Sequence, residues 1–309
     1  MQIVTTNIKS HVVQAHYLKK DVTSIVLYGD FHSFNEKAIE IQEQYIENNI
    51  LNKSNIPIIT EKPLIKKDIL STIPIFFFLQ NKSEIFENIT CIENRTFMYN
   101  ILDIENALRE INFFFKYPNS YLECYNVEEF KKKYLIEDKP NLQKTLSNFM
   151  SEIETILKDL ENEFLDTINT NMLSDEIKDK LTKDFTNAKN NILDFINNWN
   201  TIFEKNNLLT KPIIQILLDS VEVNLIKEMT NEIYSETNSI LDFKLLIEAI
   251  KQIKTNKKIA IFAGGCHIDN LIKILESIGF TIQEEKRNPQ ESYIWLNPIE
   301  VQSFDWIIN

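Results

Sequence analysis

The stretch Lys258-Ile-Ala-Ile-Phe-Ala-Gly-Gly-Cys-His267 predicts a strand that leads directly through a turn into a helix. The apolar run ends at Gly264, and a histidine follows three positions later. One face of the next predicted helix collects Ile268, Leu271, Ile272, Leu275 and Ile278, and Gly279 is its predicted C-cap. A glycine at such a turn lets the backbone bend tightly and aims the imidazole at whatever lies above the end of the strand.

The same pattern occurs near the N-terminus as Gly29-Asp-Phe-His32, after the apolar run from Ser24 to Tyr28. The capping-box sequence Ser33-Phe-Asn-Glu36 then predicts a helix to about Asn49. Glycine and histidine are scarce, with 4 of each among 309 residues, so the repeated Gly-x-x-His favours a shared role. The two turns can meet at one site if their strands lie in the same sheet.

Further strands are predicted at 56–60, 89–92, 280–283 and 293–296. The middle of the chain differs, because its apolar residues alternate four-three spacing at Leu142, Leu146, Phe149, Ile153, Ile156 and Leu160. Helical patterns continue to about Lys254. We therefore expect an α/β protein with a largely parallel central sheet flanked by helices and a long helical insertion. The expected parts are 1–125 and 255–309 for the α/β core and 126–254 for the insertion.

The four-three pattern covers fewer than four heptads, which favours an intramolecular core over a dimer seam and leaves the oligomeric state open. His11 and His16 are expected on the surface of an N-terminal helix.

Composition narrows the classes of partner. The net charge of −12, with no basic block, argues against nucleic acid or an anionic membrane as the main partner. Neither a secretory signal nor an apolar stretch of membrane-spanning length is visible, so a cytoplasmic location is expected. The remaining expectation is a peptide or small-molecule substrate.

Polar residues follow the predicted strands at the point where each strand ends. They are His32, Glu61, Glu93 with Arg95, and His267. In open α/β sheets ligands bind at the carboxyl ends of the strands, so parallel strands would bring these side chains to a common crevice. The turn residues expected to contact a substrate are Gly29, Asp30, Gly264, Gly265 and Cys266.

This order of motifs resembles the Tiki/TraB/PrgY superfamily, which is related more distantly to erythromycin-esterase-like and haem-binding lipoprotein folds. The resemblance covers mainly residues 22–110 and 257–296, and it is closest from Ala263 to Phe280. Some branches of that group are metal-dependent peptidases. The resemblance implies His32, Glu61 and His267 as ligands of a divalent ion such as Mn, Co or Zn. Asp269-Asn270 departs from the family pattern, which commonly has further glycines there.

Two imidazoles and a carboxylate can hold a divalent ion and leave an open position for water, whose pKa the ion lowers. Glu93 can then serve as a general base or orient a histidine, and Arg95 can hold a substrate carboxylate or a developing oxyanion. The predicted function is metal-assisted hydrolysis of a peptide or ester-like bond, with Glu61, Glu93 and Arg95 as catalytic residues.

Two other functions stay open. One is a metal-independent esterase or deamidase with a histidine base and Cys266 as nucleophile. The other is a non-catalytic binding or effector protein on the same fold. Some of these residues also have purely structural interpretations. Glu93 and Arg95 can form a structural ion pair, and Cys266 can be a small packed residue.

Overall fold

The computed structural model describes residues 8–9, 11–31, 36–52, 54–61, 72–73, 75–93, 95–116, 140–169, 173–217 and 222–287. His32, the predicted capping-box residues 33–35 and the predicted strand at 293–296 lie outside these ranges. The chain forms two compact units. The first comprises Met1–Glu93, Glu163–Thr182 and Leu241–Asn309, and the second comprises Asn94–Asn162 and Lys183–Ile240.

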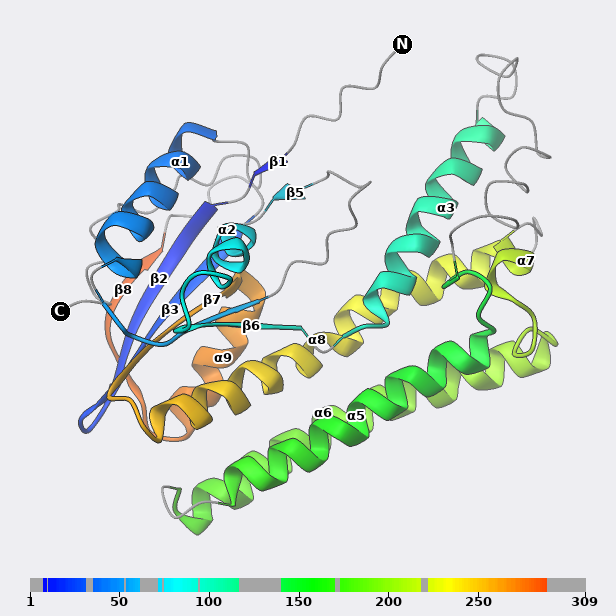
Figure 1. The fold of residues 1–309 in the computed structure, drawn as a ribbon. Coiled ribbons are helices and arrows are strands. Elements are labelled where there is room, and N and C mark those ends of the chain that lie inside the picture. Colours follow the sequence, from blue (N-terminus) through cyan, green and yellow to red (C-terminus); the bar gives the residue numbers. More distant parts are fainter. Residues whose placement is uncertain are drawn as a thin grey trace. The chain divides into compact units, whose positions relative to one another are not determined.

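A six-stranded sheet forms the centre of the first unit, in the order β6-β4-β7-β3-β2-β8 (Figure 1). Its strands are β6 (Ile89–Ile92), β4 (Ile58–Glu61), β7 (Lys258–Gly264), β3 (Thr23–Phe31), β2 (His11–Lys20) and β8 (Thr281–Arg287). The ladders from β6 to β3 are parallel, and β2 is antiparallel to both of its neighbours. The short strands β1 (Ile8–Lys9) and β5 (Thr72–Ile73) pair separately. The predicted α/β class with a largely parallel sheet is therefore confirmed.

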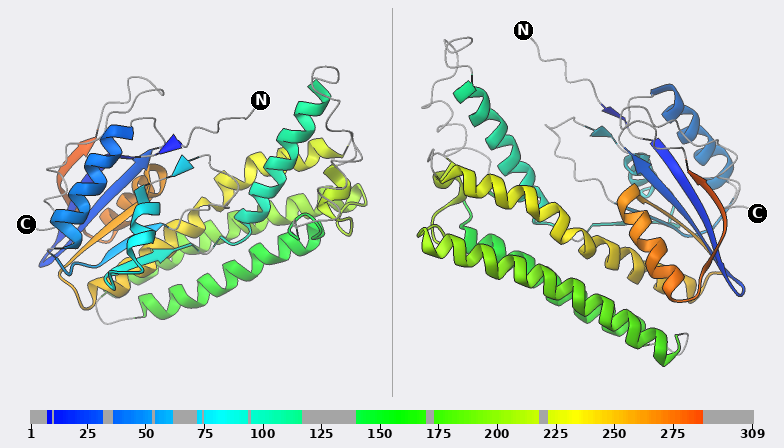
Figure 2. Two further views of the ribbon diagram at one scale, coloured as in Figure 1. Left: turned by 45° about the horizontal axis from the view of Figure 1, so that its top comes forward. Right: turned by 180° about the vertical axis from the view of Figure 1, so that it is seen from behind.

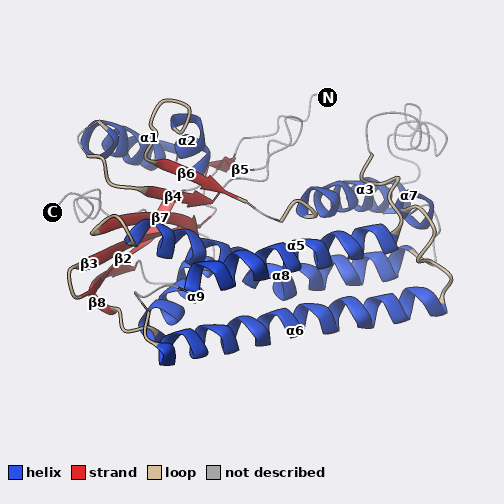
Figure 3. Cartoon of the chain, turned by 60° about the horizontal axis from the view of Figure 1, so that its bottom comes forward, coloured by secondary structure: helices blue, strands red, loops and turns tan. Residues whose placement is uncertain are grey.

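Helices cover both faces of this sheet. Helix α1 (Glu36–Tyr45), which continues as the π-helix η1 (Ile46–Leu51), and α2 (Ile75–Lys82) lie on one face, and α9 (Gly265–Ser277) lies on the other (Figure 3). Alternate residues of the strands build the core under η1 and α2, where the rings of Tyr28 and Phe262 stack with their centroids 4.6 Å apart. This alternation is expected for a sheet that is buried on both faces.

Helices make up most of the described residues between β6 and β7. They are α3 (Met98–Lys116), α5 (Leu146–Ile168), α6 (Asp175–Lys205), α7 (Ile213–Leu217) and α8 (Val223–Ile253) (Figure 2), and all of them except α7 are long. The predicted four-three stripe is buried within the chain at every position except Ile156, which is half-buried. It therefore serves an intramolecular core, as its short length predicted. None of the described helices is long and apolar enough to cross a membrane.

The expectation of an N-terminal helix carrying His11 and His16 is wrong. Both residues lie in β2, and the side chain of His16 is only 1% exposed. Because β2 lies between β3 and β8, strand pairing covers it on both edges. The hairpin that joins β2 to β3 turns at Asp21-Val22, where Asp21 has φ 51°, and this sequence lacks the Asn-Gly or Asp-Gly signal of a tight hairpin.

The two predicted Gly-x-x-His turns also differ from one another. Gly264 ends β7, as predicted, and α9 begins directly at Gly265 with His267 in its first turn, whereas β3 continues beyond Gly29 to Phe31. Gly29 is needed for a different reason, because a Cβ there would lie 2.3 Å from Cγ of Gln14 on the paired strand β2. The amide of Gln14 crosses this space and donates a hydrogen bond to the carbonyl oxygen of Gly265 at 3.0 Å.

We predict that Gly29→Ala lowers the free energy of unfolding by about 1–3 kcal/mol, since the added methyl group forces the buried Gln14 side chain from its place. Chemical denaturation of Gly29→Ala, of Gln14→Ala and of the double variant measures the energetic coupling between the two positions. The double variant should lose less stability than the sum of the single losses. Strict additivity would show that Gln14 is not the obstacle.

Candidate functional site

Three strand ends meet at the carboxyl edge of the sheet. Strand β7 lies between β3 and β4 and is parallel to both, with Asp30 opposite Gly264 and Thr60 opposite Phe262. After β3 the chain crosses to β4, which lies on the far side of β7. After β7 it runs in the opposite direction, through α9 to β8 at the other end of the sheet. Strand order thus reverses beside β7, and such switch points are where open α/β sheets bind ligands.

Glu61, the last residue of β4, is fixed to the start of α9. The backbone N–H of Gly264, the N-cap residue of α9, donates to Oε2 of Glu61 at 3.0 Å. A carboxylate is favoured there because the N-terminus of a helix carries partial positive charge and unpaired N–H groups. A Cβ at Gly264 would lie 3.6 Å from Oε2 of Glu61 and 3.5 Å from Cδ2 of His267, so these two side chains flank the same glycine.

His267, in the first turn of α9, forms a buried pair with Asp242 of α8. Its Nδ1 lies 2.6 Å from Oδ1 of Asp242, and the two side chains are 6% and 5% exposed. The other carboxylate oxygen accepts a hydrogen bond from Nδ2 of Asn270 at 2.9 Å. Because the carboxylate accepts from the imidazole at Nδ1, the neutral ring carries its proton there and leaves Nε2 as the acceptor or metal-ligating atom.

The structure therefore brings together Glu61 and His267 at one edge of the sheet. Glu93 lies at the same edge, since it directly follows Ile92, the register partner of Glu61. Cys266 is exposed in the first turn of α9, whereas Asp30 is buried opposite Gly264. His32 lies outside the described residues, so its distance from these side chains stays a prediction.

Arg95 belongs to the second unit, where it is 4% exposed. Its positive charge acts there on Tyr234, together with that of Arg109. Burial first, and then the charge and hydrogen bond of Glu105, raise the pKa of Tyr234 far above its ordinary value, and the two arginines offset part of this effect. A role for Arg95 toward a substrate stays a prediction.

No protein-family model, curated protein or solved structure matches this chain. The resemblance to the Tiki/TraB/PrgY superfamily therefore stays a prediction.

The donor set fits a divalent metal ion in its chemistry. Glu61 offers carboxylate oxygens, and His267 offers an imidazole whose other nitrogen already contacts a carboxylate, which is the usual support of metal-ligating histidines. Within the described ranges no group of three or more His, Cys, Asp and Glu side chains is arranged to hold an ion. A third ligand must come from elsewhere, and His32 is the sequence-predicted one.

Asp242 and Asn270 were missed by the sequence analysis. Asp242 stands among the apolar residues Ile240, Leu241, Phe243 and Leu245, and a lone carboxylate in such a run is a signal that it pairs inside the fold. Asn270 lies one helical turn after His267, so its amide and the imidazole project from one face of α9.

Proposed function

We propose that this chain is a hydrolase that cleaves a peptide or ester-like bond with the help of a divalent ion held by His267, Glu61 and His32. The observation that carries the proposal is the 2.6 Å contact between His267 and the buried Asp242, at the strand ends where Glu61 also lies. Buried polar pairs are costly to build, and those in such places are frequently functional.

Each residue has a defined task under this proposal. Asp242 fixes the ring orientation and tautomer of His267, and Asn270 holds the second oxygen of Asp242. The N–H of Gly264 holds Glu61 in place. Glu93, beyond the neighbouring strand, supplies a general base at the same edge. A bound Mn, Co or Zn ion would polarise the scissile carbonyl and activate water.

A second function is favoured by the same contact. A carboxylate that orients an imidazole through Nδ1 is also the arrangement by which histidine acts as a general base without metal. The thiol of Cys266, exposed at the N-terminus of α9 and adjacent in sequence to His267, would then be the nucleophile of an esterase or deamidase.

The two functions predict opposite results for the purified full chain. The assay measures metal content after dialysis against Mn²⁺, Co²⁺ or Zn²⁺, and hydrolysis of a peptide library and of ester substrates, with and without EDTA. We expect EDTA and His267→Gln to abolish turnover and Cys266→Ala to leave it largely intact. An active metal-free protein, or an inactive Cys266→Ala variant with normal metal content, would overturn the metal-assisted proposal. Stable metal binding without turnover would indicate the non-catalytic alternative.

A further inference from the structure

The last part of α8, from Leu241 to Ile253, is buried over most of its circumference. The residues of this part that are at most 5% exposed are Leu241, Asp242, Phe243, Leu245, Leu246, Ile247, Ala249 and Ile250. Lys244, Glu248 and Lys251, at spacings of four and three residues, form the polar stripe that remains. The orientation of such an enclosed helix about its own axis is fixed by the side chains that pack against each of its faces.

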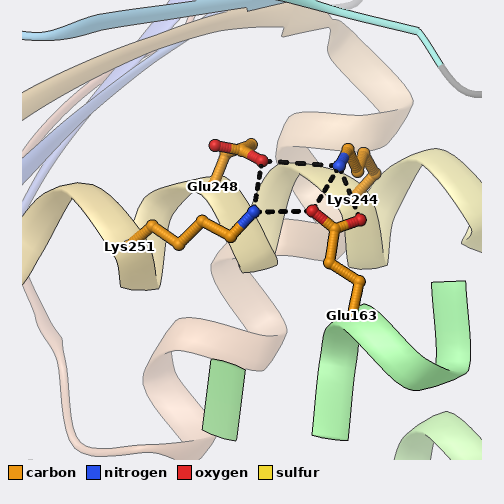
Figure 4. Close-up of polar contacts among 4 residues, drawn as sticks. All are labelled: Glu163, Lys244, Glu248 and Lys251. Carbon is orange, nitrogen blue, oxygen red and sulfur yellow. Dashed lines mark hydrogen bonds and ion pairs between the residues drawn. The ribbon is translucent and has the colours of Figure 1, made fainter. Parts of the chain in front are cut away.

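Glu163 of α5 is the partner of this polar stripe (Figure 4). Nζ of Lys244 donates to both carboxylate oxygens of Glu163 at 2.6 Å, and Nζ of Lys251 donates to one of them at 2.6 Å. Both ammonium groups also contact Glu248, at 3.4 and 3.0 Å. The next residue of α5, Phe164, meets Phe243 edge to face with the ring centroids 5.6 Å apart.

The ion pairs of Lys244 and Lys251 with Glu163 lie on the side of α8 away from His267. Each residue turns an α-helix by about 100°, so Lys244 and Lys251 lie about 200° and about 180° around the axis from Asp242. A rotation of α8 by about 20° would move a Cα at the radius of about 2.3 Å by about 0.8 Å, and the carboxylate further. A displacement of that size breaks a short hydrogen bond.

The charged forms of Glu163 and Lys251 are each favoured by their hydrogen-bond partners. Burial alone would raise the pKa of Glu163, but hydrogen bonds from Lys244 and Lys251 outweigh it and hold that pKa below its ordinary value. Burial would likewise lower the pKa of Lys251, yet the hydrogen bonds to Glu163 and Glu248 raise it. For Glu163, whose partners both lie on α8, these contacts therefore outweigh the effect of partial burial on its charged form.

We infer that Glu163 is a positioning residue for the candidate site. By holding Lys244 and Lys251 it fixes the rotation of α8 and thereby sets the Asp242 carboxylate against Nδ1 of His267. The inference rests on the proposed function in one respect only, namely that the Asp242–His267 pair supports ligand binding at that histidine.

The chain offers a matched control two residues earlier on α5. Glu161 is 33% exposed and binds Lys189 of α6 at 2.6 and 2.7 Å, whereas Glu163 is 31% exposed. Glu161→Gln thus removes an ion pair of similar length and exposure that does not involve α8. Lys251→Gln, which removes one of the two ammonium contacts of Glu163, is a milder second variant if Glu163→Gln folds poorly.

The test is the proton NMR signal of the His267 imidazole N–H, assigned in ¹⁵N-histidine-labelled full chain by its loss in His267→Gln, together with Mn²⁺ titration. We expect Glu163→Gln to shift the signal upfield or broaden it and to weaken Mn²⁺ binding about threefold to tenfold, a fraction of the effect of losing a direct partner. Lys251→Gln should give a smaller change in the same direction, and Glu161→Gln should match wild type in both measurements.

An unchanged signal in both Glu163→Gln and Lys251→Gln, or an equal change in Glu161→Gln, would overturn the inference. If wild type does not bind Mn²⁺ and only Glu163→Gln and Lys251→Gln alter the signal, the positioning role stands and the proposed metal chemistry fails.

Discussion

Asp242→Ala is expected to lower the free energy of unfolding by about 3 kcal/mol and to weaken divalent-ion binding about 10- to 100-fold. The physical reason is that Asp242 is 4% exposed and both of its carboxylate oxygens are hydrogen-bonded. Alanine leaves the buried Nδ1 of His267 and the amide of Asn270 without these acceptors. Chemical denaturation gives the stability, and Mn²⁺ titration gives the affinity.

Asp242→Asn separates the two effects. Asparagine keeps an oxygen that can accept from Nδ1 of His267, so the stability loss should be smaller than that of alanine, whereas the loss of negative charge should still weaken ion binding. An Asp242→Ala variant that is as stable as wild type and binds Mn²⁺ equally well would show that the pair has neither role.

Replacing Glu61 is expected to remove hydrolysis and most of the affinity for the ion. Glu61→Gln keeps an oxygen that can accept from the N–H of Gly264, so its stability should stay close to that of wild type. Glu61→Ala should in addition lose about 1 kcal/mol, because the N-cap residue of α9 loses its side-chain acceptor. Turnover by each variant should fall at least about 100-fold if the carboxylate is a ligand.

Mn²⁺ titration and denaturation of both Glu61 variants provide the measurement. If Glu61→Gln binds Mn²⁺ as tightly as wild type while Glu61→Ala is merely less stable, Glu61 is a helix-capping residue and not a metal ligand.

The local sequence pattern predicted the parallel part of the sheet well. The run at 89–92 coincides with β6, the run ending at Ala263 coincides with β7 to within one residue, and Gly279 follows α9 with φ 97°, as its predicted cap role requires. Buried parallel strands read as continuous apolar runs, which is why these signals are strong. β2 carries no such run, since its buried positions include Gln14 and His16, and its pairing with β3 and β8 depends on distant residues.

In the candidate site, too, residues marked by local sequence pattern were predicted and residues that act through distant contacts were not. Glu61 and His267 were predicted because Glu61 stands at the end of one strand and His267 follows another by three residues. Asp242 and Glu163 could not be predicted in this way, because they act across 25 and 81 residues of sequence through helix packing. Gly29 was predicted as a residue of the site, and the lack of space for a Cβ beside Gln14 gives it a packing role that the sequence did not indicate.

The most direct test of the central claim is a crystal of the full chain soaked in Mn²⁺ and examined by anomalous diffraction. We expect an anomalous peak about 2.1–2.2 Å from Nε2 of His267 and from a carboxylate oxygen of Glu61, with Nδ1 of His267 still bound to Asp242. A map without a peak at this edge of the sheet, or with a peak that involves neither residue, would contradict the claim.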